Sequence, residues 1–366
     1  MILYIACSLI LFLTFLRFAV ALVNMISRPF LPMTSKDHDR LPSLSVLIPV
    51  RNEEKNIGNL LGSLASLPYG KAEIIVCDDG STDNTADVVQ ACSKVDPRVR
   101  YVQGKELPPG WTGKNHACHI LAGEASNDYL LFLDADVTVG EDLLRRAVSY
   151  AGRHRLALLS MFPRQRMRSL GEKIVVPFMF RILLSLLPLF LIRRCRWSSF
   201  SAANGQMMLF HGATYRRYRF HERVKDKLAE DIEIMRLIKK SRLRGDTLVG
   251  RKEIECRMYR GYAEGVNGFS RNIFSMFGNS VAFLLLFAIT GLAGWIVLLL
   301  VSWQFMAIYL AMVIAINAMI AVTSRHRVSE NLIYLLPGIA AFYHIAFLAL
   351  KRRASKGFEW KGRKIE

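Results

Sequence analysis

Paired cysteines are absent from this chain of 366 residues. Its six cysteines are scattered, and no two of them form a CxxC pair. Closely spaced cysteines are the sequence sign of a structural zinc site or of a disulfide framework, so the sequence indicates neither. Scattered, unpaired cysteines fit a reducing compartment such as the cytosol.

Acidic residues are in short supply. The chain has 30 Asp and Glu against 49 Lys and Arg, which gives a formal charge of +19. Such an excess attracts either nucleic acid or an anionic membrane surface. Because 52% of the residues are hydrophobic and the longest apolar runs lie at the two ends of the chain, we expect an anionic membrane surface and no nucleic acid as partner.

The first residues also lack the basic segment that begins a secretory signal peptide. Residues 2–23 form an apolar run that only Arg17 interrupts, and a run of more than 20 residues can cross a bilayer. We therefore expect a retained transmembrane anchor within residues 1–30, not a cleaved signal peptide. Residues 34–40 are polar and predict a linker.

The C-terminal apolar block extends from about residue 280 to residue 350. It predicts two spanning helices over 280–301 and 303–323, with a tight turn between them. A third apolar stretch, 332–350, contains a Pro-Gly pair, so it either spans the membrane or re-enters it. Lys and Arg dominate the tail 351–366, which favours a cytoplasmic tail by the positive-inside rule.

Between these ends, short apolar runs alternate with amphipathic stretches. This alternation predicts an α/β fold with a doubly wound, mostly parallel sheet. The predicted strands cover 44–50, 73–77, 99–102 and 130–133, and the predicted helices cover 56–67 and 114–125.

Acidic residues follow three of these strands, namely Glu53, Asp78 with Asp79, and Asp134 with Asp136. Ligands of open α/β sheets bind beyond the carboxyl ends of the strands. If the backbone stays extended, the carboxylates of Asp134 and Asp136 point to the same side and can face one hard cation, Mg²⁺ or Mn²⁺. Two solvated acids at a strand end are the alternative.

A further apolar segment, residues 173–194, is broken by Arg181 and by the prolines Pro177 and Pro188, and basic residues flank it. Such a segment is poor as a spanning helix and typical of an amphipathic helix at a membrane interface. We expect it to hold the central α/β part of the chain against the membrane.

Five motifs in a fixed order resemble the family 2 glycosyltransferases, and the resemblance covers roughly residues 42–272. They are Ile48-Pro49-x-Arg51-Asn52-Glu53, Asp78-Asp79-Gly80-Ser81-x-Asp83, Lys114, Asp134-Ala135-Asp136 and Glu230-Asp231. Two further segments resemble a membrane-bound subgroup that glycosylates lipids, the carotenoid (diaponeurosporenoate) and hopanoid-associated glycosyltransferases. These segments are Pro108–Lys114 and Trp360–Arg363.

The resemblance implies a GT-A fold, a nucleotide-sugar donor such as UDP-glucose or another UDP-hexose, a divalent cation and inversion at the anomeric carbon. It implies a multi-pass protein of the cell membrane with its catalytic domain in the cytoplasm. The implied domains are an anchor (1–30), a GT-A domain (31–276), a transmembrane region (277–350) and a basic tail (351–366).

The resemblance also assigns roles to single residues. Donor binding falls to Pro49, Glu53, Asp78, Asp79, Lys114, Asp134 and Asp136. Among these, Lys114 would lie near the phosphates, and Asp136, helped by Asp134, would hold the metal on the diphosphate. Asp231 would be the general base, and contacts with the acceptor or the diphosphate would come from Trp111, Asn204, Gly205, Gln206, Arg257 and Arg260.

Simple chemistry supports these roles, although each has a structural alternative. A cation and a lysine stabilise the negative charge that develops on a diphosphate leaving group, and a carboxylate can accept the proton of a hydroxyl acceptor. Asp231 can instead be an acid that favours a helix N-terminus. The segment 204–206 can be a plain turn into a strand, and Arg257 and Arg260 can belong to a basic interfacial loop.

Processive family members carry a Gln-x-x-Arg-Trp signature, which is missing here; the corresponding region reads Arg257-Met-Tyr-Arg260-Gly261. The favoured function is therefore transfer of a single sugar to a membrane lipid such as a carotenoid or another isoprenoid. The alternatives are a processive polysaccharide synthase and exporter, a transferase acting on a sphingolipid, glycerolipid or polyprenyl phosphate, and a catalytically silent anchor protein.

Overall fold

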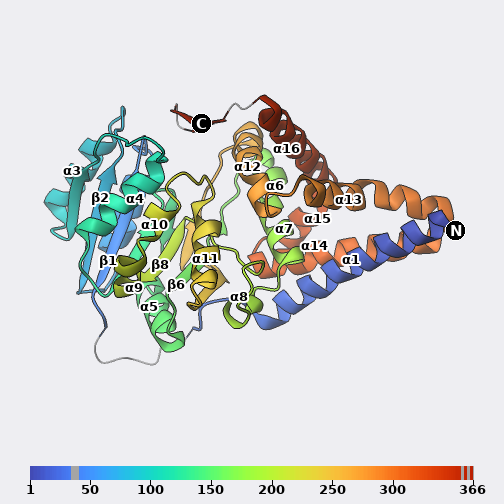
Figure 1. Ribbon diagram of the computed structural model, residues 1–366, viewed down its shortest axis with the longest axis horizontal. Coiled ribbons are helices and arrows are strands. Elements are labelled where there is room, and N and C mark those ends of the chain that lie inside the picture. Colours follow the sequence, from blue (N-terminus) through green and yellow to red (C-terminus); the bar gives the residue numbers. More distant parts are fainter. Residues whose placement is uncertain (34–40, 356–357, 361–362, 366) are drawn as a thin grey trace. The chain divides into compact units, whose positions relative to one another are not determined.

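The computed structural model describes residues 1–33, 41–355, 358–360 and 363–365 (Figure 1). The predicted linker 34–40, together with Lys361 and Gly362 of the C-terminal motif, lies outside the described residues. The chain divides into two compact units. The sheet unit comprises Phe30–Arg164 and Leu191–Arg257, and the helical unit comprises Met1–Pro29, Gln165–Phe190 and Met258–Glu366. The domain boundaries expected from the resemblance stay a prediction.

A seven-stranded sheet forms the centre of the sheet unit, with the order β3-β2-β1-β4-β8-β6-β9. The strands β1 to β4 run parallel, β8 is antiparallel to both β4 and β6, and β6 is parallel to β9. Their bounds are β1 (Leu44–Val50), β2 (Ala72–Asp78), β3 (Val99–Gln103), β4 (Tyr129–Leu133), β6 (Leu158–Phe162), β8 (Met207–His211) and β9 (Gly245–Val249). The predicted α/β fold class with a mostly parallel sheet is confirmed.

The apolar composition of the central strands follows from their place in the sheet. Strand β1 is buried along nearly its whole length, as a strand covered on both faces must be. It pairs with β2 and β4 in a register that aligns Val50 with Asp78 and Leu47 with Phe132. The carboxyl ends of these strands therefore meet at one edge of the sheet, together with the acidic residues that follow them.

Helices pack on this sheet at the positions that the sequence pattern predicts. Helix α4 contacts β1 and β2, α5 contacts β6 and β8, and α2 contacts α3 and the short strand β5. Strand β5 (Val137–Val139) pairs antiparallel with β10 (Ile254–Cys256). The helices of this unit are α2 (Ile57–Ala65), α3 (Thr85–Val95), α4 (Gly113–Glu124), α5 (Leu143–His154), α9 (Gly212–Tyr218), α10 (Phe220–Arg223) and α11 (Glu230–Lys240).

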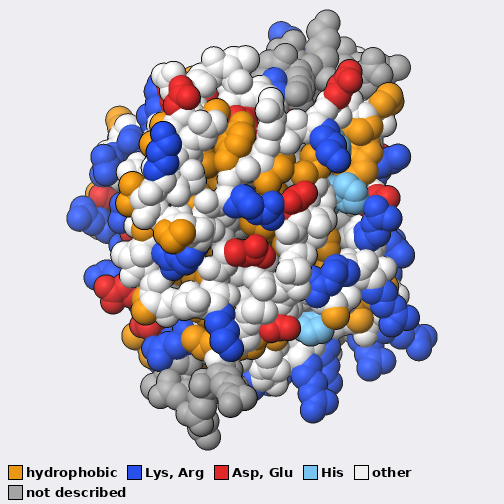
Figure 2. All heavy atoms as spheres, turned by 90° about the vertical axis from the view of Figure 1, so that its left-hand side faces the viewer, with side chains coloured by type: hydrophobic (Ala, Val, Ile, Leu, Met, Phe, Trp, Pro, Cys, Tyr) orange, Lys and Arg blue, Asp and Glu red, His pale blue; other side chains and the backbone are white. Residues whose placement is uncertain are grey.

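Basic side chains are spread over the surface of the sheet unit. Figure 2 shows the face on the side where Figure 1 places α3 and β2, and Lys and Arg there are interspersed with fewer Asp and Glu. The positive excess of the sequence therefore does not gather into a single basic patch on this face.

The helical unit is built from long apolar helices, and three of them are long and apolar enough to cross a membrane: Ile2–Ser27, Trp303–Ser324 and Leu335–Ala354. A fourth candidate is a pair of helices, Tyr262–Met276 and Val281–Thr290, bent by 111° at a short break. The helices outside the sheet unit are α1 (Ile2–Ser27), α6 (Leu170–Val175), α7 (Pro177–Leu186), α12 (Tyr262–Met276), α13 (Val281–Val301), α14 (Trp303–Ser324), α15 (Val328–Ile333) and α16 (Leu335–Ser355).

The predicted helix pair with a turn near Ser302 is confirmed. The last apolar stretch forms one helix, α16, which continues unbroken through the Pro-Gly pair. Pro337 lies in its first turn, where a missing N–H breaks no helical hydrogen bond. A short hairpin of β11 (Phe358–Trp360) and β12 (Arg363–Ile365) follows.

The segment predicted over 173–194 is a series of short helices, and its prolines lie at the breaks. Pro177 begins α7, and Pro188 lies between α7 and α8 (Phe190–Arg194). The side-chain amide of Asn24 on α1 binds the end of α7, because its Nδ2 donates to the carbonyl oxygens of Leu184 (3.0 Å) and Leu187 (2.9 Å). The broken helical segment is therefore confirmed, while its place at a membrane interface stays a prediction. The junction strand β7 (Arg164–Gln165) precedes it.

Candidate functional site

The turn that follows β2 holds two buried carboxylates. Asp78 and Asp79 are only 4% and 5% exposed. Asp78 accepts a hydrogen bond from the backbone N–H of Ser81 (2.7 Å), and the guanidinium of Arg51 donates to the backbone carbonyl of Asp79 (2.6 Å). These bonds fix the turn, so the two predicted donor-binding acids have defined positions at the edge of the sheet.

The loop after β1 closes against the same turn. Asn52 adopts a left-handed conformation (φ 54°), which asparagine tolerates better than most residues, and its side-chain oxygen accepts from the backbone N–H of Thr82 (2.8 Å). The backbone N–H of Glu53 donates to the hydroxyl of Thr85 (2.8 Å), and its carboxylate accepts from the amide of Asn56 (2.7 Å). The ends of β1 and β2 thus form one hydrogen-bonded wall.

Lys114 is the positive centre of the site. It lies in the first turn of α4, which Thr112 caps, and its ammonium contacts Asp134 Oδ1 at 2.9 Å and Glu230 Oε1 at 3.0 Å. Burial opposes the charge of Lys114, but the carboxylates of Asp134 and Glu230 outweigh burial and raise its pKa well above the ordinary value. The lysine therefore stays protonated and joins the end of β4 to the start of α11.

Gly205 lies against this group and leaves no room for a side chain. A Cβ atom at this position would be 2.8 Å from Lys114 Nζ and 2.9 Å from Glu230 Oε1, closer than real Cβ contacts. The backbone N–H of Gly205 donates to Asp231 Oδ2 (3.0 Å). The segment before β8 therefore touches both the lysine and the predicted general base.

Asp136 is half-buried beside Gln206 and Cys256. Its Oδ2 accepts from Gln206 Nε2 (3.0 Å) and from Cys256 Sγ (3.3 Å). Burial and the neighbouring Asp134 raise the pKa of Asp136 to about 7, although the thiol of Cys256 opposes the shift. A cation beside this carboxylate would reverse the shift, because an opposite charge favours ionisation.

The expectation that Asp134 and Asp136 share one side of an extended backbone is wrong. Strand β4 ends at Leu133, and Ala135 and Asp136 form a turn. The two carboxylates nevertheless remain close enough for Asp134 to raise the pKa of Asp136. Turn geometry, not strand alternation, brings them near each other.

Asp231 is the second residue of α11 and lies in its first turn. Its Oδ1 accepts from the backbone N–H of Ile232 (2.8 Å), while its Oδ2 accepts from Gly205. Burial and the adjacent Glu230 raise the pKa of Asp231 to about 7, against the opposing effects of the two N–H groups and Lys114. A carboxylate with such a pKa is well suited to accept a proton near neutral pH.

The remaining predicted residues have more varied surroundings. Pro49 lies inside β1 and pairs with Cys77. The ring of Trp111 contacts the rings of His116 and His119 on α4, with centroids 5.5 and 5.1 Å apart. Asn204 bonds to Ser160 and to the backbone of Gln206, so it shapes the turn before β8. Arg257 belongs to the sheet unit and Arg260 to the helical unit, so their joint role stays a prediction.

Sequence reasoning missed two members of the site. Glu230 enters the sequence analysis only as the neighbour of Asp231 in a family motif, whereas in the structure it is an ion-pair partner of Lys114. Its position next to Asp231 was the available signal. Cys256 was recorded only as one of six scattered cysteines, and no local pattern marks it as a neighbour of Asp136.

The residues present fit a divalent cation held jointly with a substrate. Asp136 Oδ1 is buried and has no hydrogen-bond partner, and Asp134 lies two positions away. The described part of the chain contains no cluster of three or more His, Cys, Asp or Glu suited to a metal. Mg²⁺ and Mn²⁺ bind through one or two carboxylates when substrate phosphates and water supply the other ligands, so two carboxylates are sufficient.

Comparison with known proteins gives this geometry a context. The sequence model described as Glycosyl transferase family 2 matches residues 45–217. The 4,4'-diaponeurosporenoate glycosyltransferase of Staphylococcus haemolyticus is 35% identical over 130 residues, which are 35% of this chain and 34% of the relative. The enzyme of the same name from Staphylococcus aureus strain RF122 is 42% identical over 97 residues, 26% of this chain and 24% of the relative. The chain thus matches about a third or less of the length of these curated relatives.

The fold also has a solved counterpart. A mannosyltransferase from Pyrobaculum calidifontis, solved in complex with GDP-Man and Mn²⁺, is similar over 96% of this chain and 99% of its own length, with a TM-score of 0.57 and 16% identity. At this identity the likeness concerns the fold. The predicted family resemblance and GT-A fold class are confirmed, and the family match supports the prediction of a glycosyltransferase.

Proposed function

Because residues 45–217 belong to glycosyl transferase family 2, we propose that the protein transfers a single sugar from a nucleotide-sugar donor to a lipid acceptor in a membrane. The observation that carries the proposal is the group formed by Lys114, Asp134, Glu230 and Asp231 beside Gly205. It combines a positive charge for a phosphate with a carboxylate of raised pKa for a proton transfer.

The donor is proposed to lie along the hydrogen-bonded wall made by the ends of β1 and β2. Glu53 and Asp79 would contact the nucleoside, with Pro49 and Asp78 beside them. A UDP-hexose fits this assignment. A simple anion such as sulfate or chloride would not bind to these carboxylates. Lys114 would turn from Asp134 toward the diphosphate, where its charge stabilises the leaving group.

The cation is proposed to be Mg²⁺ or Mn²⁺, held by Asp136 and Asp134. Such a cation supplies charge neutralisation on the leaving diphosphate. The solved mannosyltransferase with the similar fold contains Mn²⁺, which is compatible with this choice. The unpartnered Oδ1 of Asp136 and the raised pKa of this carboxylate are the features of this chain that support the assignment.

Asp231 is proposed to orient and deprotonate the acceptor, with inversion at the anomeric carbon. Its Oδ2 is held by the N–H of Gly205, and its raised pKa lets it exchange a proton near neutral pH. The names of the two relatives include diaponeurosporenoate, an acidic carotenoid. This supports a carotenoid or another isoprenoid as the acceptor. Trp111, Gln206, Arg257 and Arg260 are proposed contacts to acceptor or diphosphate.

The membrane setting of the proposal rests on the three candidate spans. We propose a multi-pass protein of the cell membrane whose catalytic part lies in the cytoplasm, where nucleotide sugars are made. The formal charge of +19 suits an anionic membrane surface, although the basic side chains on the face shown in Figure 2 are spread and do not form one patch.

Product analysis tests the proposal. Membranes from cells that contain the full chain are incubated with labelled UDP-glucose and other labelled nucleotide sugars, and their lipids are separated and weighed by mass spectrometry. We expect a lipid that carries one added sugar, absent from cells without the gene. A polymer would favour a processive synthase, and no labelled product with any donor would contradict the transferase.

A further inference from the structure

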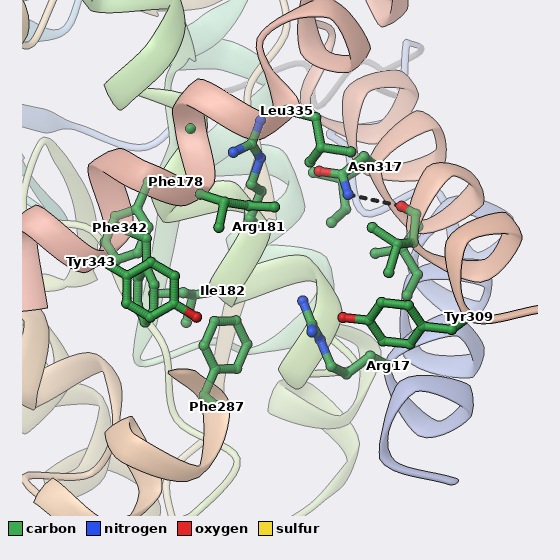
Figure 3. A pocket seen from close by; sticks show the side chains of 15 residues that line it. Arg17, Phe178, Arg181, Ile182, Phe287, Tyr309, Asn317, Leu335, Phe342 and Tyr343 are labelled. Atoms are coloured by element: carbon green, nitrogen blue, oxygen red, sulfur yellow. Dashed lines mark hydrogen bonds between the residues drawn. The ribbon is translucent and has the colours of Figure 1, made fainter. Parts of the chain in front are cut away.

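The helical unit contains a cavity of about 80 Å³ that is lined by two arginines (Figure 3). Arg17 reaches it from α1 and Arg181 from α7. The rest of the lining is mainly apolar and aromatic: Phe178, Ile182, Phe287, Tyr309, Val313, Ile316, Asn317, Ile320, Leu335, Gly338, Ile339, Phe342 and Tyr343. All lining residues belong to the helical unit.

Neither guanidinium has an acidic partner among the residues that the structure describes. Arg17 Nε donates to the hydroxyl of Ser185 (3.4 Å), and its guanidinium lies over the ring of Phe287 at 4.5 Å. Within the described part of the chain, Arg181 donates to the backbone carbonyl of Asn331 at 3.5 Å, and no described residue accepts from its buried Nε. Long or neutral contacts of this kind leave most of the guanidinium donors unused.

An unbalanced pair of arginines among apolar helices requires an explanation. Charged residues within membrane segments are costly, and they mark sites for ligands, ions or partner charges. Arginine stays protonated, so the charge cannot be avoided by titration. The ammonium of Lys114 in the sheet unit, by contrast, contacts the carboxylates of Asp134 and Glu230. The two arginines therefore differ in kind from a structural ion pair.

Two further details concern the lining of the cavity. Asn317 is 6% exposed and lines the cavity, and its Nδ2 donates to the carbonyl oxygen of Val313 (2.8 Å), so this side chain adds a polar but uncharged group to the wall. Gly338 gives Arg181 its place, since a Cβ there would lie 2.2 Å from Arg181 Nη1. Figure 3 shows both arginines on the same cavity, with Phe287 and Asn317 beside them.

We propose that this cavity binds the acidic head group of a long-chain amphiphile, with the head group on Arg17 and Arg181 and the hydrocarbon chain against the aromatic lining. Guanidinium forks match the oxygens of a phosphate or a carboxylate, and the apolar walls match an acyl or isoprenoid chain. The site lies in the helical unit and does not depend on the proposed sugar transfer.

The test uses the full chain in a neutral detergent, and its readout is the melting temperature, Tm. The probes are palmitate against hexadecanol, and phosphatidylglycerol against phosphatidylcholine, so each pair differs in charge at similar chain length. We expect an acidic probe to raise Tm by several degrees and its neutral counterpart to have little effect. A response to phosphatidylglycerol alone identifies a phosphate head group, and a response to palmitate alone identifies a carboxylate.

Three variants make the test specific. In Arg17→Gln/Arg181→Gln the charge-dependent rise in Tm should vanish, and in Gly338→Ala it should shrink because the added methyl group displaces the guanidinium of Arg181. The control is Arg327→Gln, which removes one charge from a side chain that is 81% exposed and should leave the rise intact. Since Gly338→Ala keeps both charges, it tests the site even if the double variant folds poorly.

Two results would overturn the proposal. One is an equal response of the wild-type chain to acidic and neutral probes. The other is an undiminished charge-dependent rise in both cavity variants, which would place the acidic lipid on the outer surface of the protein. The products of sugar transfer do not enter this readout, so failure here and failure of the transferase proposal are distinguishable.

Discussion

The sheet unit and the helical unit bury charges of opposite sign. In the sheet unit, four carboxylates gather around a single lysine: Asp134, Asp136, Glu230 and Asp231. In the helical unit, Arg17 and Arg181 line one cavity without a described carboxylate partner. The excess charge in each unit is opposite to the charge of the ligand that we propose for it, a cation in the sheet unit and an anion in the helical unit.

The two units also tolerate their excess charge in different ways. Carboxylates can bind protons, and the raised pKa values of Asp136 and Asp231, both about 7, are the result. Arginines cannot lose their protons so readily, and they rely on neutral contacts such as the ring of Phe287. The first cluster should therefore respond to pH, and the second should respond to lipid.

The largest effect on turnover should come from removing the proposed metal ligand in the sheet unit. Asp136→Asn removes the charge of the proposed metal ligand, and we expect turnover to fall by at least about 10³-fold, because metal stabilisation is worth several kcal/mol. EDTA should inactivate the wild-type chain to the same degree. The control is Asp142→Asn, at an acid whose side chain is 55% exposed. Full activity in excess EDTA would contradict the metal assignment.

The next effect concerns Asp231. If the acceptor is a hydroxyl, Asp231→Asn should lower kcat by about 10²–10⁴-fold, the usual contribution of a general base. If the acceptor is a carboxylic acid, it is already ionised near neutral pH, and a loss of only about tenfold is expected. We expect the larger loss, because an ionised acceptor would not require the base and Asp231 is held in place for it.

The measurement for this prediction is kcat with the native lipid. Glu233→Gln is the matched control, since Glu233 lies in the same first turn of α11 and pairs with Arg236. A mild loss in Asp231→Asn would rule out an obligatory base at this position.

A smaller effect should follow from crowding the lysine. Gly205→Ala places a methyl group 2.8 Å from Lys114 Nζ, so the lysine or the backbone must shift. Misplacement by about 1 Å can cost about 10²-fold, and we expect a loss of kcat between tenfold and that value. Gly123→Ala on α4 is the control, because a Cβ there meets no atom within 4 Å. Equal activity of both variants would show that the contact between Gly205 and Lys114 has no role in turnover.

The smallest effect concerns stability against pH. The pKa of Asp231 is about 7 in the folded chain and near 3.8 when unfolded, so the folded state holds an extra proton between these values. Stability from this group is therefore present below pH 4 and is lost as pH rises through about 7. Asp231→Asn should remove this dependence and raise Tm slightly at pH 8. If the Tm of the wild-type chain rises relative to that of the variant between pH 5 and pH 8, the predicted direction of the pH dependence is wrong.

The sheet could be predicted from the sequence because each buried strand is a continuous apolar run. Strand β1 has the predicted bounds, β3 and β4 are one residue longer than predicted at one end, and β2 is one residue longer at both ends. Long apolar runs predicted α13 and α14 equally well. The strand-end acids could be predicted for the same reason, since parallel strands share one carboxyl edge.

The rest depended on contacts between distant segments. Alternation along a strand could not predict the turn at Ala135 and Asp136, because the strand ends sooner. Cys256 reaches Asp136 across 120 residues of sequence. Arg17 and Arg181 appeared only as interruptions of apolar runs, and nothing local shows that they line one cavity.

The side chain of Asn115 joins two segments of the site that are far apart in the sequence. Its side-chain Nδ2 lies 2.8, 3.2 and 3.0 Å from the carbonyl oxygens of Val224, Lys225 and Lys227. One amide therefore fastens the helix of Lys114 to the segment that leads into Asp231. A change of length or path in that segment would take these carbonyl oxygens away from the amide of Asn115. The two sides of the site are in this way coupled to each other, although 109 residues separate Asn115 from Val224.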